Sequence, residues 1–161
     1  MLRLIAFATS FFLLQSAYES SRGTAFERWI VHGLTAAPAA ALVGAIAPDL
    51  QAVSEGSRIV SGRARFNVEA GCEGTETYLL LASALLCAGR GLRATLLGLG
   101  IGFALVYSVN VVRVAGLYLT AVHDRSWFEW LHAYVAPLAV VAVAVGAFSF
   151  WLGRYAPAAA N

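Results

Sequence analysis

Three residues of different chemical types are the candidates for catalysis in this sequence: Cys72, Arg113 and His132. Cys72 stands next to glycines in the stretch VEAGCEGTETYLLL, at the start of a long apolar run. The thiolate is the nucleophilic form of cysteine, and the positive end of a helix that begins just after Cys72 favours it. These residue types suit nucleophilic attack on a carbonyl carbon, with an arginine and a histidine to assist.

Arg113 lies in an apolar stretch, YSVNVVRVAGLY, that is expected to cross a membrane. An arginine in a spanning helix costs roughly 2.5–3.5 kcal/mol on insertion scales, so such residues usually face a partner or a wet cavity. Asn110 precedes Arg113 by three residues and therefore shares its helix face. The alternative is that the Arg113 side chain reaches the membrane surface beside a lipid headgroup.

His132 follows the aromatic stretch WFEWL. An interfacial histidine among aromatic residues is often only part of an aromatic belt, whereas a catalytic one must approach Cys72 in space. His32 and His123 are the competing candidates. The three histidines show no metal-ligand spacing, so we expect no metal site and no cofactor.

Two glycines and two acids surround Cys72. Gly71 and Gly74 are expected to leave room for a substrate chain. Glu73 and Glu76 would oppose the thiolate if they pointed at the sulfur, and they are also good first-turn residues for the helix that follows. Glu76 either caps this helix or pairs with Arg113.

The second cysteine, Cys87, lies among small apolar residues and is expected to be a core residue. If both cysteines belonged to one helix, fifteen residues would separate them by roughly 22 Å. A disulfide requires Cα atoms within about 7 Å. The two cysteines are therefore not expected to pair with each other inside that helix.

The composition identifies a membrane protein. The chain has 161 residues, of which 60% are hydrophobic and 12% charged, against about 25% charged in a soluble domain. Several apolar runs reach spanning length. The net charge of +2, with no basic cluster, argues against a nucleic-acid partner. We expect a single membrane-embedded domain over residues 1–161.

The predicted fold is an all-α polytopic membrane protein with four or five transmembrane helices. Leu4–Leu14 resembles a signal peptide but has no clean cleavage site, so we interpret it as an uncleaved first helix. Ile30–Pro48 either spans the membrane or lies at its surface. Three firmer spans follow at Thr75–Ala88, Ala94–Thr120 and Tyr134–Trp151. The loop over residues 49–71 contains short β-type runs on either side of Ser61-Gly62, which predict a hairpin.

Counting crossings places the three candidates together. The chain crosses after Cys72, turns at GRGLR, and crosses back, so that Arg113 lies about 29 Å from Ala94 along a helix. Because the hydrocarbon core is about 30 Å thick, Arg113 returns to the face where Cys72 began, and His132 opens the last span there. Arginine counts do not orient the protein. With five spans and Cys72 outside, five arginines lie inside and five outside. The inner ones are Arg22, Arg28, Arg90, Arg93 and Arg154, and the outer ones are Arg3, Arg58, Arg63, Arg65 and Arg125.

The ordered motifs GCEGTE, NVVR and WLH resemble those of the exosortase/archaeosortase family of membrane transpeptidases, over residues 66–154. Relatives commonly have Asn after the cysteine, where this chain has Glu73. The resemblance implies Cys72 as nucleophile, Arg113 as stabiliser and His132 as acid/base, with Asn110, Glu76 and Gly74 in support. It also implies a bacterial inner-membrane protein whose site faces the periplasm or cell exterior.

The family's substrates are secreted proteins with a C-terminal sorting signal: a short motif, a spanning helix and a basic tail. Besides membrane lipid, such proteins are therefore the expected partners, and the oligomeric state stays open. We expect the substrate helix to pack on the face carrying Gly98, Gly100 and Gly102. Two alternatives remain: a purely hydrolytic intramembrane protease, and a non-catalytic membrane assembly or transport subunit.

Overall fold

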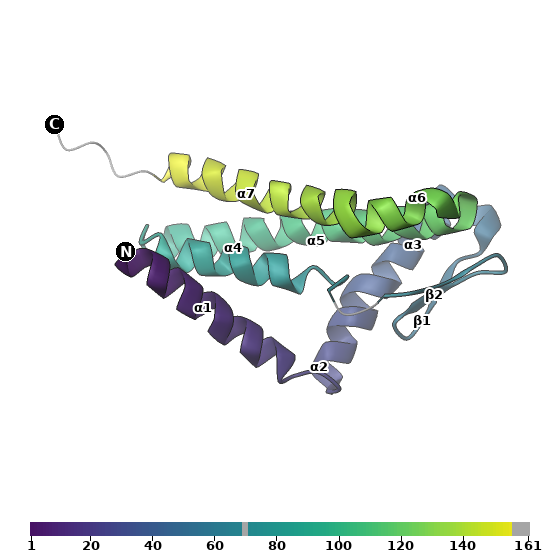
Figure 1. Ribbon diagram of the computed structural model, residues 1–161, viewed down its shortest axis with the longest axis horizontal. Helices are drawn as coiled ribbons and strands as arrows, with labels where there is room; N and C mark the ends of the chain where they lie inside the picture. The colour runs from purple at the N-terminus through teal and green to yellow at the C-terminus, as the bar shows by residue number, and fades with distance from the viewer. Residues whose placement is uncertain (69–70, 156–161) are drawn as a thin grey trace.

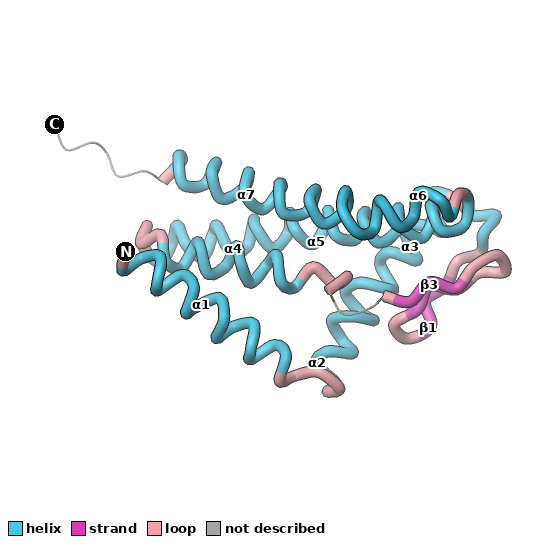
Figure 2. The backbone as a smooth tube through the Cα atoms, in the orientation of Figure 1, coloured by secondary structure: helices cyan, strands magenta, loops and turns pink. Residues whose placement is uncertain are grey.

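The computed structural model describes residues 1–68 and 71–155, which are mostly helical with one small sheet (Figures 1 and 2). The elements in chain order are α1 (Leu2–Glu19), α2 (Ala25–Arg28), the π-helical η1 (Trp29–Ala36), α3 (Ala37–Ile46), the 3₁₀ turn η2 (Pro48–Leu50), β1 (Val53–Glu55), β2 (Arg58–Val60), β3 (Arg65–Asn67), α4 (Thr75–Cys87), α5 (Leu92–His123), α6 (Arg125–Trp130), the π-helical η3 (Leu131–Val135) and α7 (Ala136–Arg154).

Three continuous helical stretches are long and apolar enough to cross a membrane: Ala25–Ile46, Leu92–His123 and Arg125–Arg154. The protein is therefore a helical membrane protein, but the expected four or five spans are not confirmed. The 13 residues of α4 give only about 20 Å of helix, against about 30 Å of hydrocarbon. The helix expected near the N-terminus forms as α1, but it is not among these three stretches.

The helix α5 joins two parts of the molecule. At one end α1, α4, α5 and α7 run side by side, and at the other end α3, α6 and the sheet gather around the end of α5 (Figure 1). The chain reverses between α4 and α5 at Gly89 and Gly91, both of which have positive φ. With 32 residues, α5 is about 48 Å long and so exceeds the thickness of the hydrocarbon core.

Two separate hydrophobic cores correspond to these two parts. The bundle core packs α4, the first half of α5 and α7 around Leu81, Leu85, Ala94, Val106, Val140, Ala144 and Trp151. The cap core packs α3, the sheet and the second half of α5, and its buried residues include Val43, Ile59, Phe66, Cys72, Val114 and Tyr118. Cys72 therefore belongs to the cap.

The predicted hairpin forms between β2 and β3, with Ile59 opposite Phe66. The turn between them is closed by a 2.9 Å hydrogen bond from the Ser61 N–H to the Ala64 carbonyl. A third strand, β1, pairs antiparallel with β2 and was not predicted. The buried side chains of Ile59 and Phe66 fix the sheet against the cap.

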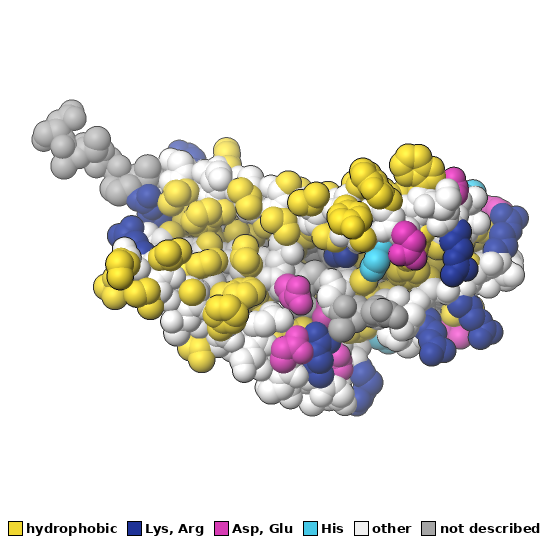
Figure 3. All heavy atoms as spheres, in the orientation of Figure 1, with side chains coloured by type: hydrophobic (Ala, Val, Ile, Leu, Met, Phe, Trp, Pro, Cys, Tyr) yellow, Lys and Arg dark blue, Asp and Glu magenta, His cyan; other side chains and the backbone are white. Residues whose placement is uncertain are grey.

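Surface chemistry divides the molecule along its length. Hydrophobic side chains cover the α1, α4 and α7 side, whereas charged side chains gather over the sheet, over α6 and at the junction of α1 and α2 (Figure 3). Four large aromatic residues of η1, α6 and η3 are exposed: Trp29, Trp127, Trp130 and Tyr134. Because aromatic belts lie at membrane–water interfaces, we infer that the cap end of the bundle meets the membrane surface.

The bundle fills the small-residue face that was expected to receive a substrate helix. A Cβ added at Gly98 would lie 2.7 Å from Trp151 Nε1, and one at Gly102 would lie 2.7 Å from Leu81 Cδ2. Only Gly100 of the three faces open space. The expectation is wrong for Gly98 and Gly102, because these glycines allow the protein's own α4 and α7 to approach α5 closely.

Candidate functional site

The loop that carries Cys72 is shaped by two glycines. Gly71 has φ +89° and Gly74 has φ +78°, a conformation that favours glycine because it has no Cβ. Cys72 is 5% exposed, and α4 begins three residues later at Thr75. The loop thus holds the thiol just before the positive end of a helix, as the sequence predicted.

The space at the two glycines differs. A Cβ at Gly71 would meet no atom of the described residues within 4 Å. A Cβ at Gly74 would lie 2.9 Å from Asn110 Cγ. The room predicted at Gly74 is therefore filled by the protein's own asparagine.

Asn110 connects the loop to α5. Its buried amide donates a 2.9 Å hydrogen bond from Nδ2 to the Cys72 carbonyl. Its Oδ1 accepts a longer hydrogen bond, 3.4 Å, from Arg113 Nη1. The N-x-x-R spacing places both residues on one helix face, so Arg113 reaches the cysteine loop through Asn110.

Cys72 and His132 line one cavity of about 650 Å³ between the hairpin, the end of α5 and α6. Its other lining residues are Arg63, Ala64, Arg65, Phe66, Asn67, Ala121, Arg125, Phe128 and Glu129. The structure thus brings together two of the three candidate catalytic side chains, which are separated by sixty positions in the sequence.

His132 has an unsatisfied ring nitrogen. Its Nδ1 is buried and has no hydrogen-bond partner in the part of the chain that the structure describes, and its ring stacks on Phe128 with centroids 5.4 Å apart. His132 belongs to η3, a π-helical segment of the kind that is frequent at functional sites. An imidazole with an unsatisfied nitrogen that lines the same cavity as a thiol is suited to proton transfer.

The other two histidines are committed elsewhere. His32 Nδ1 hydrogen-bonds to the carbonyl of Gly56 in the turn between β1 and β2. His123 Nδ1 lies 2.9 Å from the Leu119 carbonyl of its own helix. Neither lines the cavity that contains Cys72, which leaves His132 as the histidine of the site.

Arg113 lies apart from this cavity. It lines a smaller one, of about 280 Å³, between α5 and α7, and its Nε is buried without a hydrogen-bond partner. The predicted alternative that Arg113 pairs with Glu76 is wrong: within residues 1–68 and 71–155 no ion pair joins them, and Glu76 is exposed. The guanidinium is therefore held by Asn110 and keeps a donor unused.

Three arginines line the Cys72 cavity: Arg63, Arg65 and Arg125, against one acid, Glu129. Arg63 is itself 3.5 Å from Asp49. The lining of the cavity therefore contains more basic than acidic side chains.

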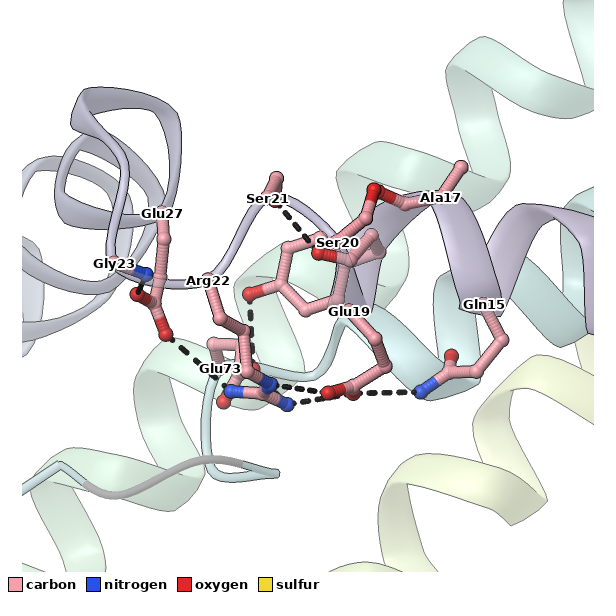
Figure 4. Close-up of polar contacts among 10 residues, drawn as sticks. Gln15, Ala17, Glu19, Ser20, Ser21, Arg22, Gly23, Glu27 and Glu73 are labelled. Carbon is pink, nitrogen blue, oxygen red and sulfur yellow. Dashed lines mark hydrogen bonds and ion pairs between the residues drawn. The ribbon is translucent and has the colours of Figure 1, made fainter.

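Glu73 turns away from this cavity. Its side chain is 1% exposed, and its Oε1 accepts a 2.9 Å hydrogen bond from the Tyr18 hydroxyl of α1. Arg22 lies 4.0 Å from the same oxygen (Figure 4). No spacing in the sequence links Tyr18 and Arg22 to a residue more than fifty positions away, so this contact could not be predicted.

The two cysteines are thiols rather than a disulfide. Over the part of the chain that the structure describes, no group of three or more His, Cys, Asp or Glu side chains is arranged to hold a metal ion. Comparison with known proteins finds no matching family, no matching curated protein and no matching solved structure.

Proposed function

We propose that this protein is an exosortase-like membrane cysteine transpeptidase that removes the C-terminal sorting signal of secreted proteins. The observation that carries the proposal is that Cys72 and His132 line one cavity at the cap end of the bundle. The residue motifs around them add support, because GCEGTE, NVVR and WLH resemble those of the exosortase/archaeosortase family.

The proposed reaction has two steps. Cys72 Sγ attacks the scissile carbonyl carbon, the C–N bond breaks, and His132 gives a proton to the leaving amine, which leaves a thioester. A second amine then attacks the thioester carbonyl, the C–S bond breaks, and the proton released from that amine returns to His132. In a purely hydrolytic enzyme, water would replace the second amine.

The remaining residues are assigned by position. Asn110 fixes the carbonyl of Cys72 and thereby the loop that presents the sulfur. Arg113 acts on the loop through Asn110, and its role as a direct stabiliser of negative charge requires its side chain to turn from its own cavity toward Cys72. The arginines that line the Cys72 cavity favour the ionised form of the thiol. A hydrogen bond that fixes a reacting group in this way lowers the activation barrier, because less conformational freedom is then lost on reaching the transition state.

We further propose that the protein resides in a bacterial inner membrane with the cap facing the periplasm or cell exterior. The test is a single cysteine introduced at the exposed hairpin residue Gly62, in a chain that lacks Cys72 and Cys87. A membrane-impermeant maleimide should label Gly62→Cys in intact cells. Labelling only after the inner membrane is opened would reverse the orientation.

The catalytic proposal is tested by co-expressing the protein with a secreted substrate that carries a spanning C-terminal tail. Cys72→Ala should abolish processing, whereas the matched variant Cys87→Ala, in the α4 helix, should process normally. Full processing by Cys72→Ala would exclude the cysteine mechanism and favour a non-catalytic assembly or transport subunit.

Mass spectrometry of the released product separates transfer from hydrolysis. A transpeptidase leaves an amine-linked group on the new C-terminus, and a protease leaves a free carboxylate. A free carboxylate in every product would contradict the transpeptidase proposal while keeping the cysteine mechanism.

A further inference from the structure

A second cavity borders the loop that carries Cys72. It has a volume of about 450 Å³ and lies between α1, the α2–η1 segment, α4 and α5. Its walls are mostly apolar and include Leu14, Ala17, Ile30, Leu34, Leu79 and Val106. Glu73 and Gly74 line this second cavity. The residue next to Cys72 in the sequence therefore faces a different cavity from the one that Cys72 lines.

Glu73 is the charged residue of this cavity, and half of its carboxylate is unsatisfied. Oε1 is bound by the Tyr18 hydroxyl, whereas Oε2 is buried and has no hydrogen-bond partner within residues 1–68 and 71–155. A buried carboxylate oxygen without a donor carries a desolvation cost of about 1–3 kcal/mol or more. The geometry therefore leaves a place for a hydrogen-bond donor at Oε2.

The charges around Glu73 favour a cationic donor. Arg22 is shared between Glu73, Glu19 and Glu27 (Figure 4). Its hydrogen bond with Glu19 is the main reason that the pKa of Arg22 is raised. Arg28, which donates to the nearby Gly23 carbonyl, adds a second guanidinium group. The three carboxylates of the cluster still outnumber its two guanidinium groups. The cluster thus keeps a net negative charge beside the apolar cavity.

Aromatic rings complete the lining. Six of them border the cavity: Tyr18, Phe26, Trp29, Tyr78, Phe103 and Tyr107. Aromatic faces attract cations and ammonium groups, most strongly where water is excluded. A carboxylate oxygen that lacks a donor, a negative cluster and aromatic walls together describe a binding site for an ammonium group attached to an apolar chain.

We propose that this cavity binds the primary ammonium headgroup of a membrane lipid, which donates a hydrogen bond to Glu73 Oε2 while its apolar chain lies against η1 and α4. A primary ammonium is specified because a quaternary one has no N–H to donate. The apolar walls exclude a free hydrophilic amine as the main ligand. This binding does not depend on the transpeptidase proposal, and its test measures no catalysis.

The test uses the purified full-length protein in a non-ionic detergent, with dodecylammonium as the probe and titration calorimetry as the measurement. Glu73→Gln should weaken binding by at least about tenfold, because it removes a charge-assisted hydrogen bond. The matched variant Glu76→Gln, an exposed carboxylate three residues away, should bind within about twofold of the unmodified protein. Equal weakening by both variants would overturn the site, because it would indicate general surface attraction.

A second probe and a second variant test the proposed hydrogen bond and the cavity separately. Dodecyltrimethylammonium should bind more weakly than dodecylammonium and should be insensitive to Glu73→Gln. Equal binding of the two probes, with equal dependence on Glu73, would overturn the proposed hydrogen bond. If Glu73→Gln does not fold, Leu34→Trp, which fills the cavity without touching the acids, should abolish binding. Unchanged binding by Leu34→Trp would overturn the proposal.

Discussion

The bundle and the cap satisfy their polar groups differently. In the bundle, Trp151 Nε1 donates to the Ala94 carbonyl at 2.9 Å, and the buried Ser83 hydroxyl donates to Leu79 of its own helix. Buried polar atoms without partners occur among the described residues of both parts, but more of them lie around the cap and the Cys72 loop. At the bundle end they are Gln15 Oε1 and Arg90 Nε, and around the cap and the loop they are Glu73 Oε2, Thr75 Oγ1, Arg113 Nε, Tyr118 Oη and His132 Nδ1.

This difference separates a part that holds the fold from a part that is poised to bind. Buried polar groups in folded proteins are nearly always hydrogen-bonded, and exceptions call for an explanation. Glu73 Oε2 and His132 Nδ1 differ from the unsatisfied atoms of Gln15 and Arg90 because each belongs to a residue that lines one of the two cavities beside the Cys72 loop. At these two positions a ligand in the cavity can supply the missing hydrogen-bond partner.

The largest effect that distinguishes the two parts is expected from Asn110→Leu. The variant leaves the buried carbonyl of Cys72 without its donor, at a cost of about 1–3 kcal/mol in the free energy of unfolding. Processing should fall by about 10- to 100-fold because the cysteine loop is no longer fixed. Ser83→Ala in the bundle is the control and should cost about 1 kcal/mol or less, with processing unchanged. Similar processing by both variants would remove Asn110 from the site.

The next effect concerns the two glycines beside Cys72. Gly74→Ala should lower the free energy of unfolding by about 1–3 kcal/mol, because a positive φ is strained for alanine and the new Cβ meets Asn110. Gly71→Ala has the same strain but open space, so its cost should be about 1 kcal/mol. Chemical denaturation would measure both. Equal losses would mean that contact with Asn110 does not limit the loop.

A third pair tests the bundle itself. Gly98→Ala should cost about 1–3 kcal/mol by overpacking against Trp151 and Leu85. Gly100→Ala, on the same helix but facing open space, should stabilise by up to about 1 kcal/mol through helix propensity. Neither should change the rate at which Cys72 reacts with iodoacetamide. A change in that rate would show that the bundle and the cap are not independent.

The sequence predicted what local chemistry determines. Apolar runs predicted the helices, the residues around Ser61-Gly62 predicted the hairpin, and helix length predicted that Arg113 returns to the level of Cys72. The Asn110 hydrogen bond to the Cys72 carbonyl agrees with that last estimate. These features follow from spacing along the chain, which a single sequence contains.

What the sequence could not predict depends on packing between distant segments. Nothing in the spacing indicated that Gly74 would be covered by Asn110, that Gly98 would receive Trp151, or that Glu73 would bind Tyr18. The expected number of four or five spans is not confirmed, because only three helical stretches of the described residues are long and apolar enough to cross a membrane. The expected segment Thr75–Ala88 forms as α4 (Thr75–Cys87), but a helix of this length is shorter than the hydrocarbon core.

The smallest effect is expected at the tip of the cap, where Asp124 caps the helix that leads to His132. Its Oδ1 accepts hydrogen bonds from the Ser126 hydroxyl and backbone N–H. Both bonds lower the pKa of Asp124, and the bond from the hydroxyl has the larger effect. Because its pKa is lower in the folded state, the stabilisation is present above the unfolded value of about 3.9 and is lost as the pH falls through the folded value. The melting temperature of Asp124→Asn, which retains a capping oxygen but no charge, should be slightly below that of the unmodified protein at pH 6, and the difference should vanish near pH 2. A difference that does not change with pH would show that the charge of Asp124 does not contribute to the cap.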